Sequence, residues 1–308
     1  YGMYQYYQQT GDATMRDIID SWFADRFAEG ATTKNVNTMA PFLTLAYRYE
    51  ETRNPAYLPW LDSWAEWAMH DMPRTQFGGM QHITLAEENH QQMWDDTLMM
   101  TVLPLAKIGK LLNRPEYIEE ATYQFLLHVQ NLMDKETGLW FHGWSYEGQH
   151  NFANARWARG NSWLTIVIPD FLELLDLPEN NAVHRYLVQV LNAQIAALAK
   201  CQDESGLWHT LLDDPQSYLE ASATAGFAYG ILKAVRKRYV GQDYAAVAEK
   251  AIRGIVQHIS PEGELLHTSF GTGMGHNLDF YRNIPRTSMP YGQAMAMLCL
   301  TEYLRKYF

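Results

Sequence analysis

The chain of 308 residues repeats one pattern four times, and this repeat limits the folds that it can adopt. Each copy is a pair of segments with helical periodicity, followed by a turn that contains Gly and, three or four residues later, His. The glycines are Gly79, Gly138, Gly206 and Gly263, with spacings of 59, 68 and 57 residues (138−79, 206−138, 263−206). Long repeats with two helices each are typical of stacked helical hairpins, in an open solenoid or a closed ring.

A closed ring fits this repeat better than an open solenoid. A ring needs no terminal repeat to cap it, and it gathers the turns on one rim, where their Gly, Trp and His residues would form a shared site. We therefore predict an all-α fold, a closed α/α barrel formed by residues 1–308 as a single domain. Helical periodicity predicts helices over residues Asp12–Ala28, Asn37–Glu51, Tyr57–Met72, Thr97–Leu112, Pro115–Met133, Asn161–Leu175, Ala182–Cys201, Ser222–Tyr239, Tyr244–Ile259 and Tyr291–Tyr307.

Residues 140–163 (WFHGWSYEGQHNFANARWARGNSW) carry the strongest functional signal. Binding clefts combine apolar surface with a few placed polar groups, and here aromatic rings that can stack on a sugar stand beside hydrogen-bonding amide, imidazole and guanidinium groups. The segment predicts a carbohydrate cleft whose candidate contacts are His142, Trp144, Trp157, Arg159 and Asn161. The alternatives are a loop packed by its own aromatic residues, a core histidine at position 142 and a rim salt bridge at Arg159.

A pair of carboxylates forms the second candidate motif. Asp95 and Asp96 stand in the segment QQMWDDTLMM, where an amphipathic helix begins. One of them could cap that helix, but this leaves the other against a like charge. Crowding and burial raise a carboxyl pKa and prepare the group to act as a general acid near neutral pH. Carboxylates in or near other loops compete for this role, namely Asp213, Asp214, Glu220 and Asp279.

Composition excludes several classes of partner. The net charge of −11 and the pI near 5.4 argue against nucleic acid and anionic membranes. No apolar run reaches the length of a membrane span. Scattered histidines and the lack of a phosphate loop before a helix predict no metal and no cofactor. Cys201 and Cys299 form neither a metal motif nor a disulfide framework, so we expect a reducing, cytoplasmic location. The sequence gives no indication of oligomeric state.

Several ordered motifs make the chain similar to a known group of enzymes. The segments MWDDTLMM, NRPEY, GLWFHGW, WARGNSW, GTGMGH and MPYGQAMAM together resemble the unsaturated glucuronyl and rhamnogalacturonyl hydrolases of glycoside hydrolase families 88 and 105, with the closer likeness to the rhamnogalacturonyl branch. The resemblance runs from about Asn35 to the C-terminus and implies an (α/α)6 barrel of six helical hairpins. The chain is short at its start for twelve helices, which leaves open the absence of a first helix.

The resemblance also implies a reaction. Members of this group remove the Δ4,5-unsaturated uronic acid from the non-reducing end of lyase-generated oligosaccharides, here expected to come from pectin, especially rhamnogalacturonan. One Asp protonates C4 of the vinyl ether and assists the addition of water at C5, after which the hemiketal opens. Asp96 in the Asp-x-Leu stretch matches this acid/base, so we expect a protonated carboxyl at position 96. His142 then contacts sugar or water, and Arg159 the uronate carboxylate.

The remaining candidates and alternatives follow from the same comparison. Trp144, Trp157, Asn161 and Asp95 are further expected substrate contacts. The second functional carboxylate of the group has no clear counterpart near residues 35–37, where Asn37 offers a hydrogen bond but no charge. A conventional inverting glycosidase or a sugar epimerase on the same barrel is the alternative enzyme, and a glycan-binding helical-repeat protein is the alternative without catalysis.

Overall fold

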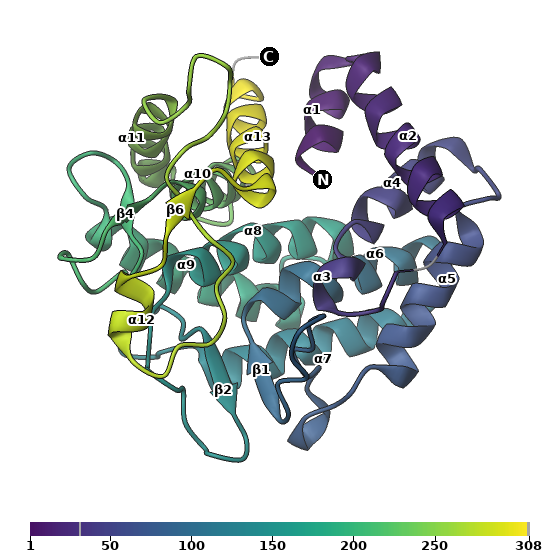
Figure 1. The fold of residues 1–308 in the computed structure, drawn as a ribbon, viewed down its shortest axis with the longest axis horizontal. Helices are drawn as coiled ribbons and strands as arrows, with labels where there is room; N and C mark the ends of the chain where they lie inside the picture. Colours follow the sequence, from purple (N-terminus) through teal and green to yellow (C-terminus); the bar gives the residue numbers. More distant parts are fainter. Residues whose placement is uncertain (31, 307–308) are drawn as a thin grey trace.

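Helical hairpins arranged in a ring form the body of the molecule (Figure 1). The computed structural model describes residues 1–30 and 32–306. Inner helices are followed by outer helices in five pairs: α1 (Gly2–Thr10) and α2 (Ala13–Glu29), α4 (Phe42–Thr52) and α5 (Leu58–Glu66), α6 (Leu103–Leu111) and α7 (Pro115–Leu132), α8 (Ala158–Leu175) and α9 (Ala182–Cys201), α10 (Ala221–Arg236) and α11 (Ala245–Val256). The inner helix α13 (Pro290–Leu304) packs on both α10 and α1.

The ring is closed, which confirms the predicted all-α barrel. Contacts run from α4 to α6, α8, α10, α13 and α1 in turn. The last gap, between α1 and α4, is bridged by the stacked rings of Tyr4 and Tyr47, whose centroids are 5.1 Å apart, and by a hydrogen bond of 2.7 Å from Tyr4 to Glu51. Within residues 1–30 and 32–306, no helix has the length and apolar character that crossing a bilayer requires.

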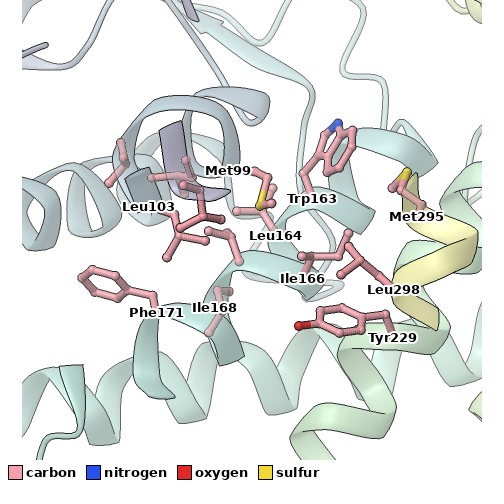
Figure 2. Packing of buried hydrophobic residues seen from close by; sticks show 14 of the residues in the cluster. Met99, Leu103, Trp163, Leu164, Ile166, Ile168, Phe171, Tyr229, Met295 and Leu298 are labelled. Atoms are coloured by element: carbon pink, nitrogen blue, oxygen red, sulfur yellow. The ribbon is translucent and has the colours of Figure 1, made fainter. Parts of the chain in front are cut away.

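The core of the barrel lies around α8, which is buried along nearly its whole length. Side chains of α8 pack against η3 and α6 on one side and against α10 and α13 on the other, as Figure 2 shows for Met99, Leu103, Leu164, Ile166, Ile168, Phe171, Tyr229 and Leu298. Burial of this much apolar surface is the main force that holds the inner ring together. The outer helices, by contrast, keep one exposed face, as α9 and α11 do.

Glycines shape the turns that follow the outer helices. Gly138, Gly206 and Gly263 have φ angles of 85°, 92° and 88°, a conformation that other residues rarely adopt. A Cβ on Gly138 would also lie 2.6 Å from the carbonyl oxygen of Ala193. In the first repeat the left-handed glycine is Gly78, with φ 79°, rather than the predicted Gly79. The repeat therefore has a conformational basis at all four turns.

Short strands and helical turns join the hairpins on one rim. The strands form antiparallel pairs, β1 (Gln92–Trp94) with β2 (Gly143–Ser145), β3 (Trp208–His209) with β4 (Leu219–Glu220), and β5 (Thr268–Ser269) with β6 (Arg286–Thr287). The shorter helical elements are α3 (Val36–Met39), the π-helical turns η1 (Trp67–Asp71) and η3 (Leu98–Val102), the 3-10 turns η2 (Gln76–Gly78) and η4 (Gln242–Tyr244), and α12 (Leu278–Arg282).

Several helix boundaries differ from the prediction. The helix predicted over Asn37–Glu51 is divided into α3 and α4 before Pro41, which lacks the N–H that a continuous helix needs. The helix predicted from Thr97 begins with the π-helical turn η3. The last predicted helix ends at Leu304, and its predicted end, Tyr307, lies outside the described residues.

Candidate active site

The β1–β2 sheet brings the two predicted motifs together. Trp94 pairs with Gly143, so the residues that follow β1 meet the residue that precedes β2. The backbone N–H of Asp95 donates a hydrogen bond of 3.0 Å to the carbonyl of His142. Asp95, Asp96 and His142 thus share one corner of the rim, although 46 residues separate Asp96 from His142 in the sequence (142−96).

The three side chains form a cluster in which only one carboxyl reaches the surface. Each offers a polar atom within 4.8 Å of the others, and His142 Nε2 lies 3.7 Å from Asp96 Oδ2. Asp95 is 0% exposed and the His142 side chain 1%, whereas the side chain of Asp96 is 15% exposed. A ligand that reaches this cluster therefore meets Asp96 first.

Neither carboxylate caps the following helix. Thr97 holds the cap position of η3 and provides no side-chain capping bond. Both carboxyl oxygens of Asp95 and Oδ2 of Asp96 have no hydrogen-bond partner among the described residues. Unsatisfied polar atoms in a buried place are costly and rare, and they need an explanation beyond structure. The helix-cap alternative considered for this pair is therefore excluded.

The environment separates the two carboxyls electrostatically. Burial, and then the charge of Asp96, raise the pKa of Asp95 well above its usual range. For Asp96 the upward effect of burial is outweighed by His142 and His82, so its pKa is lowered. Burial lowers the pKa of His142, which stays neutral near pH 7. The two shifts run in opposite directions, so the buried Asp95 is the carboxyl that more readily holds a proton, and the protonated Asp96 that we expected from the sequence stays a prediction.

His142 is held in place by residues that the sequence analysis did not identify. Tyr281 Oη lies 2.8 Å from His142 Nδ1 and accepts a bond of 3.1 Å from the N–H of Gly275. The Tyr281 hydroxyl also donates to Met274 Sδ at 3.6 Å. Tyr281 belongs to α12, and no sequence motif links it to His142.

A second histidine lies behind the cluster. His82 stacks on Trp94 at a centroid distance of 4.2 Å, and its Nδ1 lies 2.9 Å from Thr97 Oγ1. Trp94 in turn meets the ring of His142 edge-on at 5.2 Å. Burial lowers the pKa of His82 to about 4, so this ring is neutral near pH 7. Its position in a Gly-x-x-His turn was the signal that could have identified it.

The aromatic segment divides into buried and accessible parts. Trp157 is 1% exposed. Its ring centroid lies 4.3 Å from that of His142, and the guanidinium carbon of Arg159 lies 4.6 Å from the Trp157 ring centroid. Its faces are therefore occupied, which corrects the expectation that Trp157 stacks on a sugar. Trp144 is partly exposed on β2. It remains the candidate for stacking on a substrate.

Arg159 anchors a loop next to the cluster. Nη1 donates to the carbonyl of Ser269 at 2.7 Å and to its hydroxyl, and Nη2 donates to Phe270 at 3.2 Å and to Thr272 Oγ1 at 2.9 Å. The guanidinium also lies 4.7 Å from the ring centroid of Tyr291. A direct bond from Nη2 to a uronate carboxylate would have to replace the bonds to Phe270 and Thr272.

The two expected asparagines have different positions. The amide of Asn161 is fully buried and is used by the backbone, since it donates to Trp140 and Trp157 and accepts from the N–H of Trp140. This corrects its expected role as a substrate contact, because it instead fastens the aromatic segment to α8. Asn37 lies exposed on α3, which packs against η3.

The competing carboxylates all have other partners. Asp213 pairs with Arg156 at 2.5 Å. Asp214 and Asp279 both pair with Arg282, each at 2.7 Å. The remaining competitor, Glu220, is buried, accepts the N–H of Ala223 at the start of α10 and the N–H of Ser269, and so has a structural role.

The cluster also has the donor set of a small cation site. Two carboxylates and one imidazole offer three ligand atoms within 4.8 Å. Carboxylate ligands must be ionised to hold a metal, whereas burial favours the neutral form of Asp95.

Fold and site together define a class of protein: a closed helical barrel that carries a cluster of two carboxyls and a histidine on its rim. The sequence profile of Glycosyl Hydrolase Family 88 matches residues 1–307. The chain belongs to this family of glycoside hydrolases.

Relatives in sequence and structure agree with this assignment. The chain is 30% identical over 308 residues to the unsaturated rhamnogalacturonyl hydrolase YesR of Bacillus subtilis strain 168, covering 99% of this chain and 87% of the relative. A crystal structure from Salmonella enterica serovar Paratyphi A, described as a possible member of the GH105 family, has 92% identity and a TM-score of 0.99, covering 100% of this chain and 82% of that one. A similarly described Klebsiella pneumoniae structure has 87% identity and a TM-score of 0.99, with coverages of 100% and 81%.

Proposed function

We propose that the protein removes the Δ4,5-unsaturated uronic acid from the non-reducing end of lyase-generated oligosaccharides, with rhamnogalacturonan fragments of pectin as substrates. The supporting observation is the cluster in which the side chain of Asp96 is 15% exposed and the adjacent Asp95 is fully buried. The name of the Bacillus relative, an unsaturated rhamnogalacturonyl hydrolase, supports the substrate class. The free thiols of Cys201 and Cys299 suit the cytoplasmic location that we propose.

Hydration of a vinyl ether suits one acid/base group. Asp96 transfers a proton to C4 of the unsaturated ring, and positive charge develops at C5 and the ring oxygen. A water molecule adds to C5 while Asp96, now a carboxylate, takes up its proton. The product is a hemiketal. Its opening breaks the bond between C5 and the ring oxygen and leaves a hemiacetal at C1, which then expels the next sugar as an alcohol and becomes an aldehyde. His142 Nε2 lies 3.7 Å from Asp96 Oδ2, so this ring is the neighbour that can orient the carboxylate.

The arrangement disfavours a conventional glycosidase. Such enzymes place two carboxyls about 5–9.5 Å apart on opposite sides of the scissile bond. Asp95 and Asp96 lie on the same side, with Asp95 0% exposed, so no sugar fits between them. The other loop carboxylates that the sequence suggested are held in ion pairs or in a helix cap.

The substrate is an anion that must approach a chain of net charge −11. Arg159 is the cation whose charge favours ionisation of Asp95. A guanidinium can hold a carboxylate with two hydrogen bonds. We propose that the uronate takes the place of Phe270 and Thr272 at Nη2 of Arg159. Trp144 then supplies the apolar face on which the next sugar stacks.

Loss of the double bond tests this function directly. Oligosaccharides from a rhamnogalacturonan lyase digest should lose their ultraviolet absorbance when the protein is added. Asp96→Asn should lower kcat by about 10²-fold or more, since general acid–base catalysis contributes 10²–10⁴-fold, with thermal unfolding unchanged. Asp279→Asn, which alters an exposed ion pair of the same rim, is the matched control. Cleavage of a saturated glycoside, or retained activity in Asp96→Asn, would favour the conventional glycosidase; tight glycan binding without turnover would favour a binding module.

A further inference from the structure

Asp95 is a buried acid whose carboxyl interacts with another acid, Asp96. It is 0% exposed, and neither of its carboxyl oxygens has a hydrogen-bond partner among the described residues. A carboxylate in such a place loses its hydration without compensation. The nearest polar atoms that can respond belong to Asp96 and His142, within 4.8 Å.

The fold leaves space for the Asp95 carboxyl at one position, where a glycine packs against it. Gly160, in the first turn of α8, faces Asp95, and a Cβ at Gly160 would lie 2.7 Å from Asp95 Cγ. Any other residue at position 160 would thus displace the carboxyl from behind Asp96. The glycine has no left-handed φ angle that would require it, so the close approach of Asp95 accounts for it.

The groups around Asp95 carry little positive charge. Arg159 contributes a weaker attraction than burial and the charge of Asp96, which both oppose ionisation of Asp95, and its guanidinium donates to the loop at Ser269–Thr272. The titratable groups that face Asp95 are Asp96 on the same turn, His142 before β2, Arg159 on α8 and Tyr281 on α12, with His82 behind Asp96.

We infer that Asp95 is a positioning residue that shares one proton with Asp96 and returns it to Asp96 for each turnover. This role rests on the proposed hydration reaction. The proton moves from the Asp95 carboxyl to the Asp96 carboxylate, and Asp96 then transfers it to C4. The added water gives its hydroxide to C5 and its proton to Asp96, so the pair again holds one proton and one negative charge.

Asp95→Asn tests the shared proton, because an amide has the same shape but cannot supply the proton. Asp96 must then take its proton from solvent, because its buried neighbour no longer holds one. The alkaline limb of the kcat profile should move to lower pH by at least about one unit. At pH 7, kcat should fall about tenfold or more, while KM changes less than about threefold. A profile that coincides with that of the unsubstituted chain would overturn the inference.

A matched control separates this effect from the loss of a buried acid in general. Asp170 is also buried, on α8, but its carboxyl bonds to Lys233 at 2.5 Å rather than facing another acid. Asp170→Asn should therefore destabilise the fold yet leave the shape of the kcat profile unchanged. A shift of the same size in both variants would mean that the effect of Asp95→Asn is structural.

A titration without substrate decides the question even if the variant does not fold or the proposed substrate is not consumed. The ¹³C carboxyl signals of aspartate are followed by NMR in the Asp170→Asn chain, which removes the other buried aspartate. A protonated carboxyl at pH 7 supports the shared proton, and ionisation of all aspartates at pH 7 overturns it. Failure to consume unsaturated oligosaccharides, by contrast, would refute the proposed function and leave this result standing.

Discussion

Gly160→Ala sets two opposing effects against each other at the centre of the site. Gly160 lies in the first turn of α8, so replacing it by Ala stabilises by at most about 1 kcal/mol, the value for a helix interior. Against this, the added methyl would lie 2.7 Å from Asp95 Cγ and closer still to Oδ2, in a place where Asp95 is fully buried. Overpacking of this kind costs about 1–3 kcal/mol. We therefore expect a net loss of stability of about 0–2 kcal/mol, a fall of only a few degrees in Tm.

Activity should respond much more than stability. Displacement of Asp95 separates it from Asp96, and a misplacement of about 1 Å can cost 10²-fold in rate. Hydration kinetics and urea unfolding should be measured on the same preparation. Gly254→Ala is the control. Gly254 lies on the outer helix α11, and its Cβ would overpack against Leu207 at 2.5 Å. The reasoning is refuted if Gly160→Ala retains full kcat, or if Gly254→Ala lowers kcat as strongly for the same loss of stability.

Two further predictions follow from the neighbours of the cluster. Tyr281→Phe removes the partner of His142 Nδ1 and of the Gly275 N–H. We expect kcat to fall with KM nearly constant, and the free energy of unfolding to decrease by about 1–3 kcal/mol. Unchanged steady-state kinetics would remove Tyr281 from the site. Burial lowers the pKa values of both His82 and His128 from 6.5 to about 4. The unfolded chain therefore binds more protons below pH 6.5, so the free energy of unfolding should fall between pH 6.5 and 4, by up to about 3 kcal/mol for each histidine. In urea unfolding, His128→Gln should lose less stability over this pH range than the unsubstituted chain. An equal loss of stability would contradict the buried, neutral ring of His128.

The barrel could be predicted because its determinants are local. Apolar spacing within a helix and a glycine in the following turn are visible in a short stretch of sequence, and α9 begins and ends where the pattern predicts, at Ala182 and Cys201. The helix α1 was not predicted, because its tyrosines and glutamines (GMYQYYQQT) show no strong apolar face. Tertiary contacts, such as that of Tyr4 with Tyr47, hold it in the ring.

The site was only partly predictable for a related reason. Asp95, Asp96 and His142 stand in recognisable motifs, and the short β1–β2 pairing is enough to join them. Which ring faces a ligand depends on packing from distant segments, so the burial of Trp157 and the loop contacts of Arg159 could not be read from their motif. Tyr281 lies 139 residues from His142 in the sequence.

The four turns also explain why the site lies in one part of the rim. The repeated Gly–His turns place His82 and His142 against the same ring, Trp94, because β1 and β2 pair directly. In the third repeat His209 lies 3.8 Å from Asp203, and in the fourth His267 lies exposed. A repeated turn thus supplies equivalent positions, while strand pairing decides which become neighbours. An acid–base site needs neighbours held at fixed distance, and only the first two turns place their histidines beside the carboxylate pair.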